Sequence, residues 1–426
     1  MRNTFIVFFI FTSLSVFCQD RFLPLDTISS KEFHINLFEE YKSKYDAFNK
    51  NLDLIKSNQK KIVEEIYIEN QKEFLENIKN NNFISDKNIN SYLQELLTEV
   101  LKKNNIDSKE YTILLSKDSE INASNIGDGT IIINYGLFLA VENEDELVFV
   151  ISHEIGHQYL NHVKNEIENF AKQSTSGEII QKTNEIRKQK YNKATLANNL
   201  LKNIKYKNYS ERRKKEIEAD SIGLNFYKKT LRNPEYAISL LNKLDKSNQE
   251  RDSLTIQDCK LCFENNRFKL KIKYFESEQS LFQKYDTNNA FNIDSLKTHP
   301  DCTTRIELLK KHIVTNGQQT NSSFFLGIKK NCVPQNLINL YSNQNYGTCL
   351  YESLKLYKLD KNNEDLQVII FLTLDKIYKS KSNYTISKYM PSLDNKNNSQ
   401  SLNRFINFIN NIKMSDLEIL VNQFKN

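Results

Sequence analysis

The chain has 426 residues, and 59 Lys or Arg against 53 Asp or Glu give a formal net charge of only +6. The two signs are interspersed, and no basic stripe with interleaved aromatic residues is present, which argues against a nucleic-acid partner. Only nine glycines and five prolines occur, and Leu, Ile, Lys, Glu and Asn are abundant, so we expect a mainly helical protein of two or three domains.

The N-terminus has the pattern of an export signal. A basic start precedes an apolar run from Phe5 to Phe17, which is too short and wrongly flanked for a spanning helix. We expect residues 1–18 to be a signal peptide and the protein to be periplasmic or secreted. A lipid anchor on Cys18 is the alternative. Phe17 fits a lipidation site poorly, because small residues are preferred before the modified cysteine. Membrane association is then expected only through that anchor or through partners, and the oligomeric state is not indicated.

Helical patterns lead into two predicted strands. Residues 19–88 are expected to form an N-terminal helical segment, and five apolar residues on one face predict a helix over Ser91–Lys103. Tyr111–Ser116 is a predicted strand. Gly129–Asn134 is a β-branched run after a turn and predicts a second strand. Its polar ends favour a partly exposed edge, and the alternative is an interior strand.

An HExxH motif, His153-Glu154-Ile155-Gly156-His157, lies inside a strongly apolar run that predicts a buried helix. Positions i and i+4 share one face of a helix, so His153 and His157 can point their imidazoles at one ion. Glu154 lies beside them, placed to take a proton from a water held by a metal. The alternative is an ordinary hydrogen-bonded pair of histidines, because the bare motif also occurs by chance.

A second pair at i, i+4 spacing follows, Glu216 and Asp220. A catalytic zinc site takes three protein ligands and leaves a fourth position open, so Glu216 can be the third ligand. Asp220 can accept the free N–H of a ligand histidine and fix its tautomer. A solvated charged helix is the alternative. A close-packed face of small residues is instead indicated by Ala219, Ile222 and Gly223.

Three further segments carry expectations. Residues 161–210 are polar with a weak apolar stripe and are expected to form a mobile helical cover. Residues 316–426 are expected to form a helical C-terminal domain, and the join at Leu359–Asn363 resembles a tetratricopeptide-type helix-turn-helix. In an oxidising compartment Cys332 can pair with Cys349, and Cys259 or Cys262 with Cys302, although the connectivity cannot be deduced.

The two motifs together resemble the gluzincin-type zinc metallopeptidases of peptidase family M48, nearest to its soluble exported members. The similarity spans roughly Ile89 to Leu309, with four pieces in the family's order: Ile121–Leu137, the HExxH motif, Glu216–Asp220 and Thr298–Ile306. It implies an α+β, mainly helical fold with a zincin-like core, a small β-sheet and a helical C-terminal region. The implied metallopeptidase domain is 89–315, with an insertion at about 245–291 that could cover or reshape the cleft.

Carried over residue by residue, the resemblance implies one Zn²⁺ per chain. His153, His157 and Glu216 would be its ligands. Glu154 would be the general base, and Asp220 would lie behind a ligand.

The remaining site residues follow from the same resemblance. His299 falls where relatives place a histidine that can approach the metal, either as a reversible fourth ligand or as a donor to the transition state. A surface turn is the alternative, because Pro300 extends the preceding backbone. Arg305 falls where relatives place an arginine near the site, and His299 or Arg305 would help the zinc ion to stabilise the oxyanion. His162 is interpreted as structural, because three ligands are already supplied. Ser124 replaces an aromatic residue, so the cleft wall there is expected to differ.

In the enzymes that this chain resembles, the edge strand beside the motif helix binds substrate in an extended form, and we expect Gly129–Asn134 to be that strand. Backbone recognition gives a broad preference for unfolded chains. The hypothesis is a zinc-dependent metalloendopeptidase that acts on unfolded or misassembled exported proteins. The alternative is a chaperone or assembly factor whose site is gated by His299 or by the insertion, and whose C-terminal helices bind clients. A purely structural protein would require both i, i+4 pairs to be coincidence.

Overall fold

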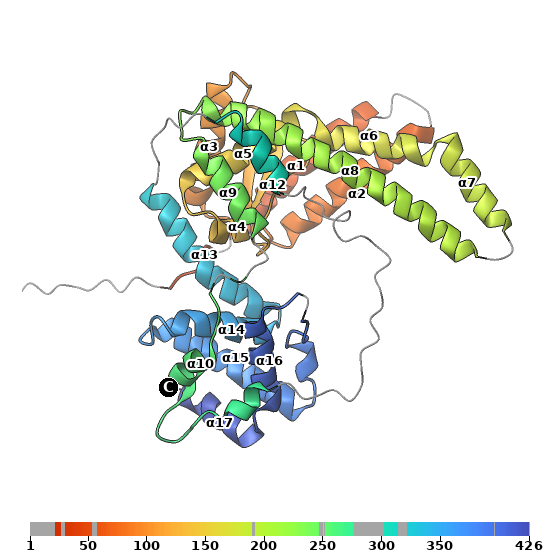
Figure 1. Cartoon of the computed structure of the whole chain (residues 1–426). Helices are drawn as coiled ribbons and strands as arrows, with labels where there is room; N and C mark the ends of the chain where they lie inside the picture. The colour runs from red at the N-terminus through yellow and green to blue at the C-terminus, as the bar shows by residue number, and fades with distance from the viewer. Residues whose placement is uncertain are drawn as a thin grey trace, which may run out of the picture.

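The computed structural model describes residues 22–26, 30–52, 58–189, 192–246, 250, 252–276, 302–313, 322–395 and 397–425. The expected signal peptide and His299 lie outside these residues. Within them the chain is a mainly helical α+β protein with a small sheet, as the sequence predicts (Figure 1). None of the described helices combines the length and the apolar character needed to cross a membrane.

The elements lie along the chain as follows. The first part contains α1 (Lys31–Leu52), α2 (Asn58–Lys79), α3 (Lys87–Lys103), β1 (Thr112–Ser116), β2 (Ala123–Asn125), β3 (Thr130–Asn134), α4 (Tyr135–Ala140), α5 (Glu144–Tyr159), α6 (His162–Ser174), α7 (Gly177–Lys188) and α8 (Lys193–Lys228). The second part contains α9 (Glu235–Asp245), α10 (Ile256–Phe263), η1 (Ile272–Phe275), α12 (Cys302–Lys310), α13 (Ser323–Ser342), α14 (Tyr346–Tyr357), α15 (Glu364–Ser382), η2 (Ile386–Lys388), α16 (Gln400–Asn411) and α17 (Met414–Gln423).

The sheet has the strand order β1-β3-β2, with β1 parallel and β2 antiparallel to β3. The expectation that Gly129–Asn134 is the free edge is therefore wrong, because β3 is the central strand and β2 is an edge. The hairpin between them turns at Gly127 and Gly129, whose φ angles of 89° and 91° suit glycine. Strand β2 has only three residues, so its sequence gives no alternating apolar pattern.

The two faces of the sheet pack on different helices, since strand side chains alternate from side to side. Ile131 and Ile133 belong to the main core with α3 and α5. Ile132, between them, packs against a smaller cluster formed mainly by α1 and α2. The motif helix α5 is thus held on one face of the sheet.

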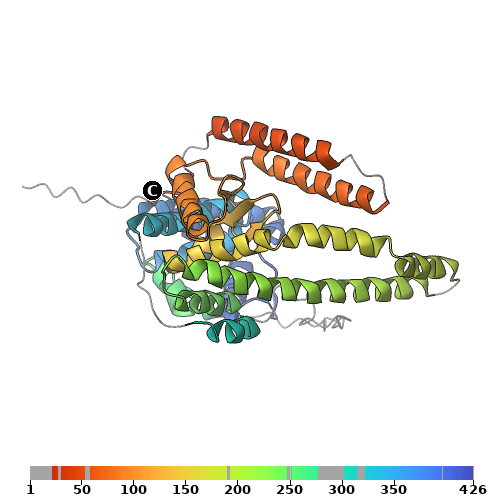
Figure 2. The same cartoon turned by 90° about the horizontal axis from the view of Figure 1, so that it is seen from above.

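The segment expected to be a helical cover is helical, but it extends outward. Helix α6, helix α7 and the first half of α8 project from the body as an arm (Figures 1 and 2). Helix α7 has no buried residue.

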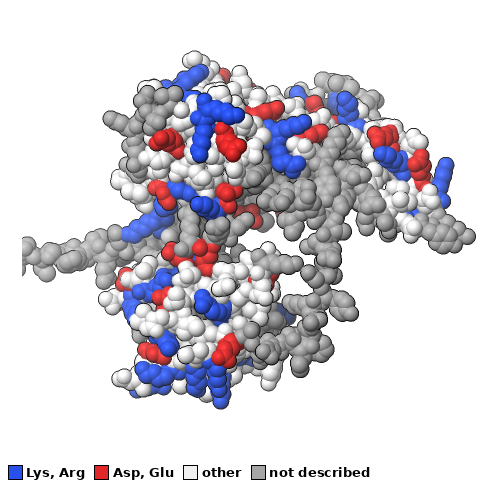
Figure 3. Space-filling model, viewed as in Figure 1, with Lys and Arg blue, Asp and Glu red and all other residues white. Residues whose placement is uncertain are grey.

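A second hydrophobic core lies in the C-terminal part of the chain, among α14, α15, α16 and α17. Residues 252–276, the described part of the segment expected to be an insertion, contribute to this second core through Leu254, Phe263 and Phe275, among others. Helix α13 joins the two cores: Phe325 and Ile328 pack in the first, and Leu337 packs in the second. Positive and negative side chains are interspersed over both bodies on the face shown in Figure 3.

The cysteines of the described residues are buried and form no disulfide bond, so neither expected disulfide pairing is present. Cys302 lies in the first core, whereas Cys259 and Cys262 lie in the second. Cys332 packs in the first core, and the Cys349 thiol contacts the Leu337 carbonyl oxygen at 3.4 Å instead.

Candidate metal centre

Helices α5 and α8 approach each other closely because small residues line their contact. A Cβ at Gly156 would lie 2.7 Å from the Ile222 side chain and 3.0 Å from the Ala219 carbonyl oxygen. A Cβ at Gly223 would lie 2.9 Å from the Cα of His153. The close-packed face predicted for α8 is thus observed. It brings the downstream acidic pair alongside the HExxH helix.

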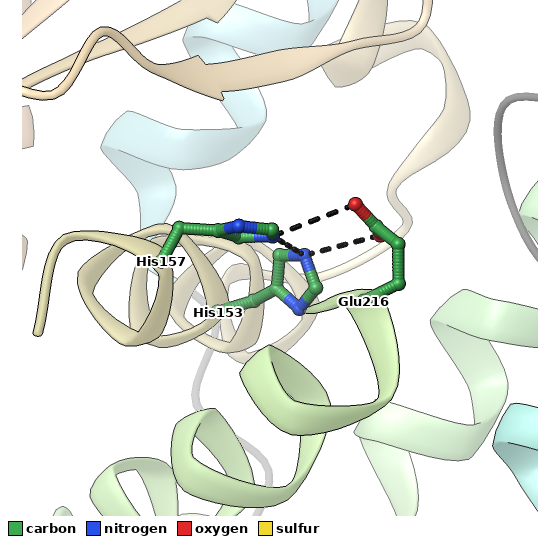
Figure 4. A group of neighbouring side chains, drawn as sticks. All are labelled: His153, His157 and Glu216. Carbon is green, nitrogen blue, oxygen red and sulfur yellow. Dashed lines mark hydrogen bonds and ion pairs between the residues drawn. The ribbon is translucent and has the colours of Figure 1, made fainter. Parts of the chain in front are cut away.

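This approach brings His153, His157 and Glu216 together (Figure 4). The two Nε2 atoms lie 3.0 Å apart. The Glu216 carboxylate lies 3.6 Å from His153 Nε2 and 3.5 Å from His157 Nε2. Three potential ligand atoms, from one turn of α5 and from α8, therefore converge on a common point.

The spacing of these atoms fits a tetrahedral zinc ion. With metal–ligand distances of about 2.0–2.2 Å, neighbouring ligand atoms of a tetrahedral site lie roughly 3.3–3.6 Å apart. The Glu216 carboxylate lies within this range of both imidazole nitrogens, at 3.6 and 3.5 Å through its two different oxygens, and the 3.0 Å between the two Nε2 atoms is slightly shorter. Two imidazoles and one carboxylate are also the donor set of a catalytic rather than a structural zinc site.

Asp220 lies behind His153 in a buried position. Its Oδ1 is 3.0 Å from His153 Nδ1, on the far side of the ring from Glu216. An Nδ1 proton that faces this carboxylate would leave Nε2 with a free lone pair, as a metal ligand requires. The predicted orienting position of Asp220 matches this geometry.

Arg305, from α12, is buried against the same acidic residues. Its Nε and Nη2 donate to the two Asp220 carboxylate oxygens at 2.5 and 2.6 Å. Its Nη1 lies 3.5 Å from Glu216. The guanidinium thus partly neutralises and orients the carboxylates of Asp220 and Glu216.

A further chain of contacts begins at His157 and was not found from the sequence. His157 Nδ1 lies 3.0 Å from Nδ1 of His162, the first residue of α6. The other ring nitrogen of His162, Nε2, lies 3.2 Å from the Glu218 carboxylate on α8. The partners are 56 residues apart in sequence, so no local pattern reveals them.

The pKa values of the two motif histidines move in opposite directions without a metal. Burial lowers the pKa of His153, but the carboxylates of Asp220 and Glu216 outweigh it and raise the value to about 10. Burial, together with the positive charge of His153, lowers the pKa of His157 to about 3. The metal-free trio therefore holds a proton on one ring, and a bound cation would replace that proton.

Glu154 is a buried carboxyl group in the wall of the same cleft. Burial raises its pKa to about 7, although the charge of His153 opposes the shift. A carboxyl group poised near neutral pH can both accept and release a proton under ordinary conditions.

The trio opens into a cavity of about 380 Å³. Edge strand β2 forms one wall, including Ser124 as the sequence predicts, and apolar residues such as Phe149 and Leu241 form another. Among the described residues, none that line this cavity comes from α6, α7 or 252–276. The expectations that these segments cover the cleft therefore find no support in the described part of the chain.

Known proteins resemble parts of this chain. The model of peptidase family M48 matches residues 87–313, which is 227 of 426 residues and includes every site residue discussed above. Over 91 residues the chain is 31% identical to a Vibrio cholerae serotype O1 protein named "Putative beta-barrel assembly-enhancing protease". That stretch is 21% of this chain and spans only 19% of the relative. The converging trio and the extent of the family match lead to one conclusion: the chain belongs to peptidase family M48.

Proposed function

We propose that this protein is a zinc-dependent endopeptidase. The observation that carries the proposal is the trio of His153, His157 and Glu216, whose spacing fits a tetrahedral zinc ion, beside the buried carboxyl group of Glu154. Membership of a peptidase family supports the same reaction class.

The residues of the site divide the chemistry between them. A zinc ion bound at the trio supplies a Lewis acid that lowers the pKa of a water toward neutrality. Glu154 is positioned to accept a proton from the attacking water and to give it to the leaving nitrogen. Asp220 and Arg305 hold His153 and Glu216 in place, so we assign Arg305 a positioning role.

Strand β2 is suited to bind the substrate backbone. The Asn122 carbonyl oxygen and the Ile126 N–H bond to β3. In an antiparallel pair the alternate residues, Ala123 and Asn125, then direct their backbone groups away from β3. Both residues line the cavity, so an extended peptide can add to this edge.

Recognition through the backbone favours unfolded chains over particular sequences. The export signal expected from the sequence would bring the enzyme to unfolded or misassembled exported proteins. The name of the Vibrio cholerae relative, which refers to β-barrel assembly, supports that substrate class. Export and a metal-directed role for His299 belong to this proposal as expectations, and a lipid anchor on Cys18 remains the alternative to a soluble exported protein.

The second candidate is a chaperone or assembly factor. The C-terminal helices with their own hydrophobic core favour it, because they form a body separate from the metal site. In that case a Glu154→Gln variant would retain function in cells.

The same variant tests the enzyme in solution. Glu154→Gln keeps the shape of the side chain and the metal trio, so we expect bound zinc to be unchanged in a metal analysis. Cleavage of casein should fall by at least about 100-fold, because the proton acceptor is lost. Glu168→Gln, an exposed change on α6, is the matched control and should cleave normally. Full activity in Glu154→Gln would contradict the mechanism.

A further inference from the structure

We propose that Glu218 and His162 position the zinc ligand His157 through two hydrogen bonds in series. The inference rests on the proposed zinc site and adds two residues to a site otherwise made of the three ligands, Glu154 and Asp220. His162 Nδ1 lies 3.0 Å from His157 Nδ1, and its Nε2 lies 3.2 Å from Glu218.

The direction of both hydrogen bonds follows from the metal site. His157 can offer the Nε2 lone pair to a metal only if its proton is on Nδ1. That N–H then donates to His162 Nδ1, which must carry a lone pair. The single proton of a neutral His162 ring is therefore on Nε2, where it donates to Glu218.

A carboxylate can only accept, so Glu218 favours this arrangement over the reverse one. In the reverse arrangement His162 Nδ1–H would donate to His157. His162 Nε2 would then present a lone pair to the Glu218 carboxylate, and His157 Nε2 would carry a proton in place of a metal. Glu218 thus selects the tautomers of two rings, although it is not a ligand.

The packing around His162 fixes this geometry. His162 is the first residue of α6, and its side chain is 6% exposed. Lys215, from α8, donates to its carbonyl oxygen at 3.1 Å. The ring of His162 also packs edge-to-face on His157, with centroids 4.9 Å apart. Helices α5 and α8 therefore hold the two ends of the series, and α6 holds the ring between them.

Glu218 itself is exposed, with 62% of its side chain accessible to solvent. An exposed ion pair contributes little to stability, so removing it should leave the fold intact. Loss of a partner behind a metal-binding histidine, in contrast, typically weakens metal affinity by about 10–100-fold. The two effects can therefore be measured apart.

The test compares the full-length protein with Glu218→Ala and with Glu211→Ala. Glu211 lies two helical turns earlier on α8, so its replacement removes the same charge from the same helix. Zinc affinity is measured by competition with a chelator, and the visible absorption of the cobalt-substituted protein reports the geometry of the ligands. Urea unfolding of the zinc-free proteins checks that both variants fold.

We expect Glu218→Ala to bind zinc about 10–100-fold more weakly and to change the cobalt spectrum, with an unchanged unfolding midpoint. Glu211→Ala should match the wild type in all three measurements. An affinity of Glu218→Ala within twofold of the wild type would overturn the inference, as would an equal loss in Glu211→Ala. A wild-type protein that binds no zinc would instead refute the proposed function on which the inference depends.

Discussion

At the scale of single residues, the site could be predicted where its chemistry follows local spacing. His153, His157, Glu216 and Asp220 lie at i, i+4 positions, and the structure brings them together as expected. The contact of Glu218 with His162 could not be predicted, because it joins α8 to α6. The two residues are 56 positions apart, and no local spacing relates them.

Glu154 shows how function and stability conflict at one residue. Its carboxyl group is buried, and burial raises the pKa from 4.5 to about 7 in the metal-free protein. The folded state therefore binds more protons than the unfolded state between these pH values. The stability that protonated Glu154 contributes is therefore fully present below pH 4.5 and is lost as the pH rises through 7.

Glu154→Gln should remove this pH dependence, because the amide stays neutral. In zinc-free protein we expect the free energy of unfolding of the variant to equal that of the wild type near pH 4.5. Above pH 7 the variant should be more stable, by roughly 2–3 kcal/mol. Urea unfolding from pH 4.5 to 8 measures the difference. A difference that does not change with pH would show that Glu154 does not titrate in this window.

At the scale of elements, the site depends on how closely α8 approaches α5. The sequence indicated this contact through small residues on one face of α8. It did not identify the edge strand, because β2 has only three residues while β3 has the apolar, β-branched pattern. Position within a sheet is decided by hairpin pairing, here the turn at Gly127 and Gly129, rather than by the composition of one strand.

Gly223→Ala should separate the two helices. The added Cβ would lie 2.9 Å from the Cα and 3.0 Å from the N of His153, and backbone atoms cannot move aside easily. We expect a loss of about 1–3 kcal/mol in the free energy of unfolding. Zinc affinity should fall by at least about tenfold, because Glu216 and Asp220 move away from His153.

The control for this change is Gly327→Ala in α13, where no atom lies within 4 Å of the added Cβ. Because alanine favours a helix interior, this variant should be as stable as the wild type or up to about 1 kcal/mol more stable. Zinc affinity should be unchanged. Equal zinc binding by both variants would mean that the α5–α8 contact does not determine the geometry of the trio.

At the scale of the whole molecule, the described residues form two large hydrophobic cores, and the metal site lies beside the first of them. Residues 252–276 belong to the second core, although they precede α12 of the first. The sequence could not assign them, because their few apolar residues lie in a polar stretch. Their packing partners, such as Phe408 and Phe424, lie about 150 residues further along the chain.

Phe263→Ala tests whether the second core is independent of the metal site. Phe263 is fully buried, and its ring packs near Phe408 and Phe424. Its truncation should cost about 3–5 kcal/mol of unfolding free energy in the C-terminal part. Zinc affinity, measured by chelator competition under native conditions, should be unchanged. A parallel loss of zinc affinity would show that the two cores behave as one unit.

Helix α13, which packs in both cores, contains a proline that weakens its backbone hydrogen bonding. Pro334 lies inside α13, between Cys332 in the first core and Leu337 in the second. Proline has no N–H to bond to the preceding turn, and its ring crowds the carbonyl group four residues earlier. The turn of helix that connects the two bodies is therefore the one with the least resistance to bending. If a bound partner pulled on the C-terminal helices, α13 would bend at Pro334 before the packing of either core changed.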